Sequence, residues 1–268
     1  MLTNKLISKI NQISLNAGLL ILAYYKNYEN LVVTQKHDNS PVTEADLAAN
    51  NFIIKELKKL FPDIDIVSEE NNEEANLRAA QKNEYFMVDP LDGTNSFIKH
   101  SDEFTVNIAF IQNKKAIFGS IYLPAKDILY FTDEANIAYK TEKFSLGNNL
   151  TKKISSTRKS NITRVICTKR EPERSEIIKN LKSRDIQTKD LISVASSYKF
   201  CLIAEGKADL YPRRANINAW DIAAGHAILN AAGGKIINLD NNLELIYNFH
   251  YNFKIPLFEC SNFQNKRK

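Results

Sequence analysis

One short segment of the sequence combines the residue types that bind a divalent cation. Residues 89–94 read Asp-Pro-Leu-Asp-Gly-Thr and follow an apolar run that is typical of a buried strand. Asp89, Asp92 and the carbonyl oxygen of Leu91 would meet at the end of that strand, where Gly93 permits a tight turn. These ligand atoms are all oxygen, which Mg²⁺ prefers. The segment therefore predicts a magnesium site.

Three further acidic side chains stand at comparable places. Asp46 lies in a helix-start segment, Glu69 follows a predicted strand, and Asp221 begins an Ala-rich helix. Strand ends and helix starts converge on one crevice of an open α/β sheet, so we expect these groups to meet there. A helical turn after Gly93 would add free backbone N–H groups for a phosphate. Two metal ions about 4 Å apart at such a place could hold the oxygens of a phosphoryl transfer.

The same residues also have simpler interpretations. Asp-Pro-x-Asp-Gly is common in turns. Asp46 and Asp221 could do no more than stabilise a helix N-terminus, and the Thr94 hydroxyl could be only a helix cap. The matching contexts of Glu69 and Asp221 favour a shared site over an isolated turn.

The elements that must position these groups alternate between helix and strand. Hairpins occur among them, so we expect a mixed sheet covered by layers of helices. The predicted helices are 4–26, 43–60, 172–183, 196–205 and 220–232, and the predicted strands are 31–34, 65–68, 85–89, 105–111, 116–122, 128–132, 164–167 and 208–211, with a loop at 37–41. Segments 69–83 and 136–160 are polar, and the second is the expected boundary region. We expect an N-terminal α+β subdomain over 1–140 and a C-terminal α/β subdomain over 141–268.

Composition narrows the class of protein. The 268 residues are 44% apolar with a net charge of +5, which excludes a disordered chain. Three distant cysteines without a CxxC motif argue against a disulfide framework and favour a reducing cytoplasm. The apolar run 18–25 is shorter than the roughly 20 residues of a membrane span, so no integral membrane segment is expected. Short basic stretches predict no nucleic-acid partner.

Several motifs resemble those of a known family. Segments 68–70 (SEE), 89–94 (DPLDGT) and 220–225 (WDIAAG) resemble the signatures of the inositol monophosphatase superfamily of lithium-sensitive, Mg²⁺-dependent phosphomonoesterases. Segments 97–99 (FIK), 103–109 (EFTVNIA) and 196–206 (SSYKFCLIAEG) resemble its 3′(2′),5′-bisphosphate nucleotidase branch of the CysQ type. The similarity runs from the first helix to Gly234. Departures from the branch pattern at 95–96, 195 and 214–217 replace none of the proposed metal ligands.

The resemblance implies a layered αβαβα sandwich with mixed sheets, and it assigns roles to individual residues. Two or three Mg²⁺ ions would be held by Glu69, Asp89, the Leu91 carbonyl, Asp92 and Asp221. The attacking water would be oriented and deprotonated by Thr94 with Glu69 or Asp46. The substrate would be bound by Gly93, Thr94, Ser196, Lys199, Arg213 and Asp221. A lysine and an arginine suit a substrate that retains a second phosphate, although both could also be ordinary surface cations.

The expected activity is hydrolysis of the 3′-phosphate of adenosine 3′,5′-bisphosphate to AMP and phosphate, with 3′-phosphoadenylyl sulfate as a further candidate. We expect a cytoplasmic monomer or homodimer, with peripheral contact at the inner face of the membrane left open. One alternative is an inositol monophosphatase or another sugar-phosphate phosphatase. A second is a non-catalytic regulator that binds metal or nucleotide. A third, an RNA-binding protein, rests on net charge alone.

Overall fold

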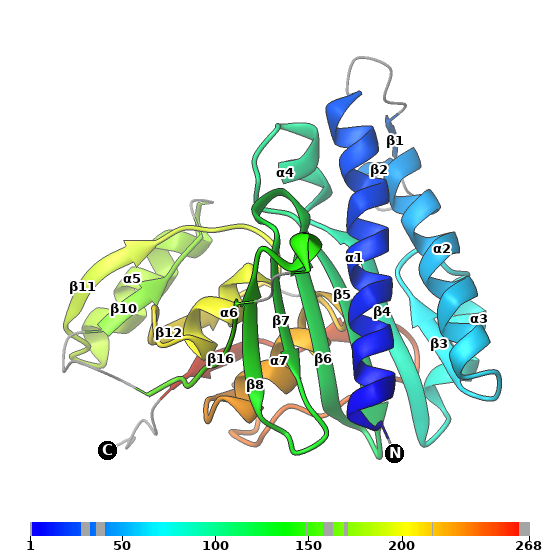
Figure 1. The fold of residues 1–268 in the computed structure, drawn as a ribbon. Coiled ribbons are helices and arrows are strands. Elements are labelled where there is room, and N and C mark those ends of the chain that lie inside the picture. The colour runs from blue at the N-terminus through cyan, green and yellow to red at the C-terminus, as the bar shows by residue number, and fades with distance from the viewer. Residues whose placement is uncertain are drawn as a thin grey trace.

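Two large β-sheets and three layers of helices form most of the protein (Figure 1). The computed structural model describes residues 2–27, 33–35, 41–147, 150–157, 163–168, 171–215 and 217–262. Helices α1 (Asn4–Lys26) and α2 (Glu44–Leu60) cover one face of the larger sheet. Helices α6 (Tyr198–Ala204) and α7 (Trp220–Ala231) lie between the sheets, and α5 (Glu173–Ser183) packs on the smaller sheet through Ile177 and Leu181. The order of layers is αβαβα, as predicted.

The larger sheet has seven strands in chain order. They are β3 (Asp65–Ser68), β4 (Glu84–Asp92), β5 (Thr105–Gln112), β6 (Lys115–Leu123), β7 (Ile128–Thr132), β8 (Ala138–Glu142) and β9 (Leu150–Lys153). β3 and β4 are parallel, and the other pairs are antiparallel. Asp89 pairs with Asn107 and Asp92 with Thr105, so β4 carries one extra residue there. Such a bulge re-aims the side chains at the end of a strand.

The smaller sheet combines parallel and antiparallel strands. Its order is β11 (Thr188–Ile192), β10 (Thr163–Ile166), β12 (Leu210–Arg213), β16 (Phe258–Ser261) and β14 (Lys235–Asn238). Two short ribbons pair β1 (Val33–Gln35) with β2 (Pro41–Thr43) and β13 (Ile217–Asn218) with β15 (Lys254–Ile255). Short helices complete the fold, namely α3 (Glu73–Ala80), α4 (Thr94–Ile98), η2 (Pro124–Lys126) and η3 (Phe144–Leu146).

Helix α1 buries one apolar face. Ile10, Ala17 and Ile21 on that face have no exposed surface, and they pack in the cluster that α1 shares with α2 and the larger sheet. By length and composition alone α1 could also cross a membrane, but half of the apolar window concerned is buried inside the protein. The core helix of a globular protein can have the same length and composition, and the contacts of α1 with α2 and the larger sheet are those of a core helix.

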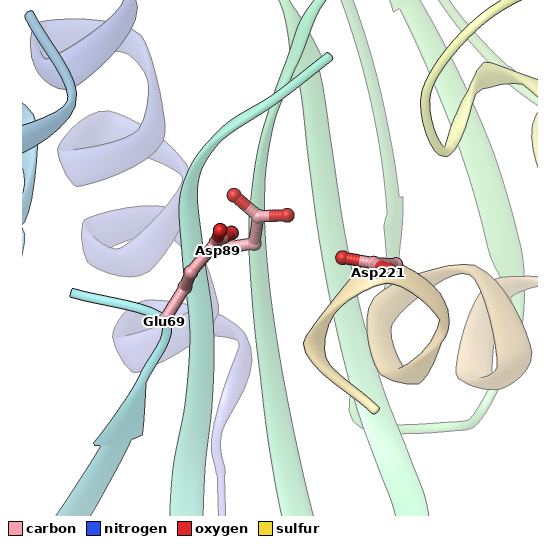
Figure 2. A group of neighbouring side chains, drawn as sticks. All are labelled: Glu69, Asp89 and Asp221. Carbon is pink, nitrogen blue, oxygen red and sulfur yellow. The ribbon is translucent and has the colours of Figure 1, made fainter. Parts of the chain in front are cut away.

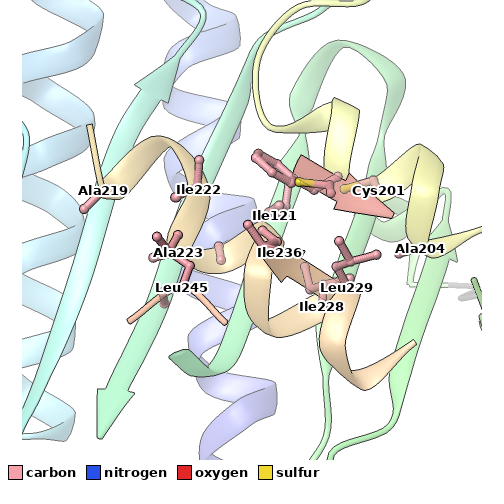
Figure 3. Packing of buried hydrophobic residues seen from close by; sticks show 14 of the residues in the cluster. Ile121, Cys201, Ala204, Ala219, Ile222, Ala223, Ile228, Leu229, Ile236 and Leu245 are labelled. Carbon is pink, nitrogen blue, oxygen red and sulfur yellow. The ribbon is translucent and has the colours of Figure 1, made fainter. Parts of the chain in front are cut away.

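Helix α7 is the centre of the inner layer and carries Asp221 in its first turn. Its small and branched side chains pack between the two sheets, where Ile222, Ala223 and Ile228 are fully buried (Figure 3). The helix approaches β6 very closely, because a Cβ atom on Gly119 would lie 2.2 Å from the carbonyl oxygen of Ala224. Glycine at this position therefore allows α7 to pack closely against the larger sheet. This close packing positions Asp221, in the first turn of α7, near the sheet.

The predicted elements agree with the structure wherever the apolar pattern is strong. The five predicted helices are confirmed as α1, α2, α5, α6 and α7. The polar segment 69–83 contains α3, a short helix with only two buried residues, Asn76 and Ala79. The expected boundary region contains β8 and β9, and β9 is a wholly exposed edge strand, rich in lysine as edges often are. Segment 31–34 and the loop 37–41 fall largely outside the described residues, and the division at residue 140 stays a prediction.

Candidate active site

Three carboxylates from separate elements form an acidic cluster. Glu69 follows β3, Asp89 lies on β4, and Asp221 stands in the first turn of α7. One oxygen atom of each lies within 4.8 Å of the other two. Figure 2 shows the Glu69 and Asp89 carboxylates side by side, with Asp221 approaching them from the start of the helix. Strand ends and a helix start therefore meet here as the sequence indicated.

The cluster concentrates negative charge in a partly buried place. Burial raises the pKa of Asp221 well above its usual range, and the nearby charges of Asp92 and Glu69 raise it further. The Asn218 backbone N–H donates to Asp221 Oδ2 at 3.0 Å and offsets this only in part. A divalent cation would relieve the repulsion, and a donor set of carboxylate oxygens is the kind that Mg²⁺ prefers. The residues present therefore fit a magnesium site.

Ser197 connects Asp92 to the inner helices. Its backbone N–H and its hydroxyl both lie 2.6 Å from Asp92 Oδ2, and the hydroxyl oxygen is also 2.6 Å from the Asp221 carbonyl oxygen. Asn107 Nδ2 donates to the same hydroxyl at 2.8 Å. Ser197 and Asn107 are almost fully buried. This network fixes Asp92 relative to α7, and sequence reasoning missed both residues because only the folded sheet brings them together.

A second buried network holds the end of β3, just before Glu69. The Ser68 hydroxyl donates to Asn50 Oδ1 at 2.6 Å. Asn76 of α3 accepts from the Ser68 backbone N–H at 3.0 Å and donates to its carbonyl at 2.7 Å. Asn50 and Asn76 therefore fix the strand end that presents Glu69. Neither was predicted, because an asparagine in a polar helix carries no distinct sequence signal.

Thr94 and Asp46 form a hydrogen-bonded pair beside the cluster. The Thr94 hydroxyl lies 3.1 Å from Asp46 Oδ1 and 3.2 Å from the Leu91 carbonyl oxygen. Asp46 Oδ2 accepts from the Thr43 backbone N–H at 2.8 Å and from the Thr43 hydroxyl at 2.5 Å. Burial raises the pKa of Asp46, although these hydrogen bonds work in the opposite direction. Asp46 is thus both the helix-start acid of α2 and the partner of Thr94.

Gly93 makes the turn between β4 and α4 possible. Its φ of +93° lies in the left-handed region, and a Cβ atom there would lie 3.1 Å from the Glu103 carbonyl oxygen and 3.3 Å from Ser196 Cβ. The predicted helical turn is confirmed as α4, which begins at Thr94. Glu103 in turn accepts a hydrogen bond from the Ala195 backbone N–H at 2.8 Å. The Gly93 turn and the 195–196 loop therefore lie close together, with Glu103 in contact with both.

One cavity of about 500 Å³ is lined both by the acidic cluster and by two cationic side chains, Lys199 and Arg213, which we call its cationic end. It is lined by all but one of the residues that the sequence singled out, namely Glu69, Asp89, Leu91, Asp92, Gly93, Thr94, Ser196, Lys199, Arg213 and Asp221. Asp46 reaches it through Thr94. The structure thus brings the predicted residues together, and their individual roles stay predictions.

The cationic end consists of Lys199 on α6 and Arg213 at the end of β12. Lys199 Nζ donates to the Ser196 carbonyl oxygen at 3.0 Å and lies 5.9 Å from the centre of the Tyr211 ring. Burial lowers the pKa of Lys199. Arg213 Nη1 donates to both carboxylate oxygens of Glu173. Sequence reasoning did not single out Glu173, which lies 40 residues away in the chain.

The fold and the cavity define a layered αβαβα protein with a carboxylate site suited to divalent cations. Residues 4–258 match the inositol monophosphatase family. The chain is 41% identical over 233 residues to 3′(2′),5′-bisphosphate nucleotidase CysQ of Buchnera aphidicola subsp. Acyrthosiphon pisum, covering 87% of this chain and 84% of that protein. It is 39% identical over 233 residues to the CysQ nucleotidase of Escherichia coli K12, covering 86% and 89%.

A solved structure gives the same result. CysQ from Bacteroides thetaiotaomicron, described as a bacterial member of the inositol monophosphatase family, superposes with a TM-score of 0.78 at 33% identity, over 96% of this chain and 97% of that one. The chain belongs to the inositol monophosphatase family, as the sequence motifs indicated.

Proposed function

We propose that the protein is a Mg²⁺-dependent 3′(2′),5′-bisphosphate nucleotidase. It hydrolyses the 3′-phosphate of adenosine 3′,5′-bisphosphate to give AMP and phosphate, and 3′-phosphoadenylyl sulfate is a second substrate to test because it carries the same 3′-phosphate. The similarity to the CysQ nucleotidases supports this activity. The observation that carries it is one cavity that is lined both by the acidic cluster and by the two cations Lys199 and Arg213.

Glu69, Asp89, the Leu91 carbonyl, Asp92 and Asp221 would hold two or three Mg²⁺ ions. When bound, these ions neutralise the phosphoryl oxygens and stabilise the charge that develops on the leaving 3′-oxygen. Ser197 and the Asn107 amide keep the Asp92 carboxylate in place for this role. The Gly93 and Thr94 backbone N–H groups would bind the phosphate that is hydrolysed.

Thr94 would orient the attacking water. Its hydroxyl lies within hydrogen-bond distance of Asp46 Oδ1 and of the Leu91 carbonyl oxygen, and when its proton is donated to Asp46 its oxygen can accept a proton from water. The water proton then moves to Thr94 as the Thr94 proton moves to Asp46, or it moves directly to Glu69. Burial raises the pKa of Asp46 and makes it a stronger base than an exposed aspartate. No covalent enzyme intermediate is required.

Lys199 and Arg213 would bind the phosphate that remains on the nucleotide. Both are cations that line the cavity, and Ser196 lies between them and the Gly93 turn. An inositol monophosphate offers no second phosphate to these cations, so the cationic end favours the bisphosphate nucleotide. A cytoplasmic location accords with Cys167, Cys201 and Cys260, which are buried free thiols.

The test measures phosphate release from adenosine 3′,5′-bisphosphate and from inositol 1-phosphate, each with Mg²⁺ and with excess chelator. We expect metal-dependent release that strongly favours the nucleotide. A preference for inositol 1-phosphate would support the metal-dependent hydrolysis but contradict the proposed nucleotide substrate. Absence of release from both would leave a non-catalytic binding protein as the explanation. Metal content of the active protein would give the number of ions.

A further inference from the structure

The cationic end of the cavity contains an acidic side chain that the proposed reaction does not use. Glu173 lies in the first turn of α5 and lines the cavity together with Arg213. Its carboxylate oxygens lie 3.2 and 3.1 Å from Arg213 Nη1, and Oε1 also accepts from the Arg214 backbone N–H at 3.2 Å. The Glu173 and Arg213 side chains are only 12% and 15% exposed. This contact is a partly buried ion pair with three hydrogen bonds rather than a surface ion pair.

The pair leaves part of the arginine unused. A guanidinium carries five N–H groups in one rigid plane, and Glu173 engages those of Nη1 alone. Arg213 Nε is buried and finds no hydrogen-bond acceptor in the part of the chain that the structure describes. Nη2 also has no hydrogen bond among the described residues and is not one of their buried atoms, so its two N–H groups are the donors that a ligand oxygen in the cavity can reach. The open donors of Arg213 therefore suit an anion in the cavity.

Glu173 also restricts the position of the Arg213 guanidinium. The flexible stem of an arginine loses entropy when it is fixed, and a contact present before binding removes that cost from the binding step. The same cavity holds the carboxylates of Asp92 and Asp221, which would attract an unanchored guanidinium. Arg213 is instead paired with Glu173. Its negative charge weakens the attraction of a phosphate, but that charge already accepts three hydrogen bonds, from Arg213 Nη1 and from the Arg214 backbone N–H.

We propose that Glu173 is a specificity-determining positioning residue, which anchors Arg213 Nη1 so that the remaining donors of the guanidinium bind the phosphate that is not hydrolysed. This inference deepens the proposed function and rests on it for the identity of the ligand. Glu173 acts through Arg213 and touches neither the scissile phosphate nor the attacking water. Its effect should therefore depend on whether the substrate has a second phosphate.

The experiment compares Glu173→Gln with Glu176→Gln, which removes a neighbouring carboxylate from the same first turn of α5 but from an exposed position. We expect Glu173→Gln to raise the KM for adenosine 3′,5′-bisphosphate by about tenfold, because one charge-assisted contact is misplaced. The KM for adenosine 3′-monophosphate should change by less than about twofold, since the affected contact is absent there. Glu176→Gln should alter neither value.

A double-mutant cycle separates positioning from a structural role. In an Arg213→Ala background, Glu173→Gln should cause no further rise in KM, because the residue that it positions is gone. A further rise there, an equal rise for both substrates, or a lower KM for the bisphosphate would each overturn the proposal. The last result would mean that Glu173 competes with the phosphate.

A binding measurement distinguishes failure of this inference from failure of the proposed function. Titration calorimetry in chelator gives the Kd of adenosine 3′,5′-bisphosphate without turnover. If the wild-type protein releases no phosphate but Glu173→Gln still weakens this Kd by about tenfold, the positioning role stands and the activity is wrong. If the wild-type protein is active and neither Kd nor KM changes, the activity stands and the positioning role is wrong.

Discussion

The two ends of the cavity are built in different ways. The acidic end rests on β4 and the start of α7, with Asp89, Asp92 and Thr94 delivered by one turn of the chain. The cationic end takes Lys199 from α6 and Arg213 from β12, and a third element, α5, supplies Glu173. One local segment thus supplies part of the acidic end, with Glu69 and Asp221 added by tertiary packing, whereas the cationic end is assembled by tertiary packing throughout.

This difference suggests a division of labour, in which the acidic end carries out the reaction and the cationic end selects the substrate. The acidic end has the groups that a phosphoryl transfer needs, whichever alcohol is released. We expect the cationic end to attract and orient the substrate. Among the described residues, Lys199 and Arg213 form no hydrogen bond with the acidic cluster, although the charge of Lys199 acts on Asp92 and Asp221. Changes at the acidic end should therefore lower kcat for every substrate, whereas changes at the cationic end should raise KM for bisphosphates alone.

Asp92→Asn should have the largest effect. It removes a proposed metal ligand and places an amide where Ser197 now donates two hydrogen bonds to Oδ2. We expect kcat to fall by about a thousandfold or more for nucleotide and inositol substrates alike. Steady-state kinetics with far-UV circular dichroism would check this, and Asp63→Asn at an exposed turn is the control. Retention of wild-type kcat would remove Asp92 from the chemistry.

Thr94→Val should have the next largest effect. Valine keeps the shape of threonine but removes the hydroxyl that lies 3.1 Å from Asp46 Oδ1 and that we propose orients the attacking water. The expected fall in kcat is about a hundredfold, with little change in KM for either type of substrate. Thr94→Ser restores the hydroxyl and should restore most of the rate. If serine is as poor as valine, packing rather than proton transfer explains Thr94.

Lys199→Met should act on one class of substrate only. Methionine keeps an apolar stem near Tyr211 and removes the charge. We expect KM for adenosine 3′,5′-bisphosphate to rise by about tenfold while kcat for inositol 1-phosphate is little affected. Parallel kinetics on the two substrates test this. Equal effects on both would show that the two ends of the cavity are not independent.

The smallest effect concerns pH. Burial lowers the pKa of Lys199, so this lysine loses its charge at a lower pH than an exposed one. Its attraction for phosphate is fully present below that pKa and is lost as pH rises through it. KM for the bisphosphate should therefore climb at alkaline pH before that for inositol 1-phosphate does. Lys199→Arg should remove this difference, because arginine stays charged.

The residues of the acidic end were easier to predict from the sequence than those of the cationic end, because more of them lie close together in the chain. Residues 89–94 lie in one turn, so their types and spacing already indicate the site. Lys199 and Arg213 were placed by family resemblance, and nothing in their local sequence indicates the cavity. Ser197, Asn107 and Glu173 were missed because their partners are 15 to 105 residues distant. The fold was more predictable, because buried strands and amphipathic helices carry their own periodic signal.

The most direct test of the division of labour uses the unaltered protein. The ratio of kcat/KM for adenosine 3′,5′-bisphosphate to that for adenosine 3′-monophosphate measures what the second phosphate contributes, and a chelator measures what the acidic end contributes. We predict a ratio of about a hundredfold or more, from two cationic contacts, with both activities lost in chelator. Equal kcat/KM for the two nucleotides, or activity that survives chelation, would contradict the account.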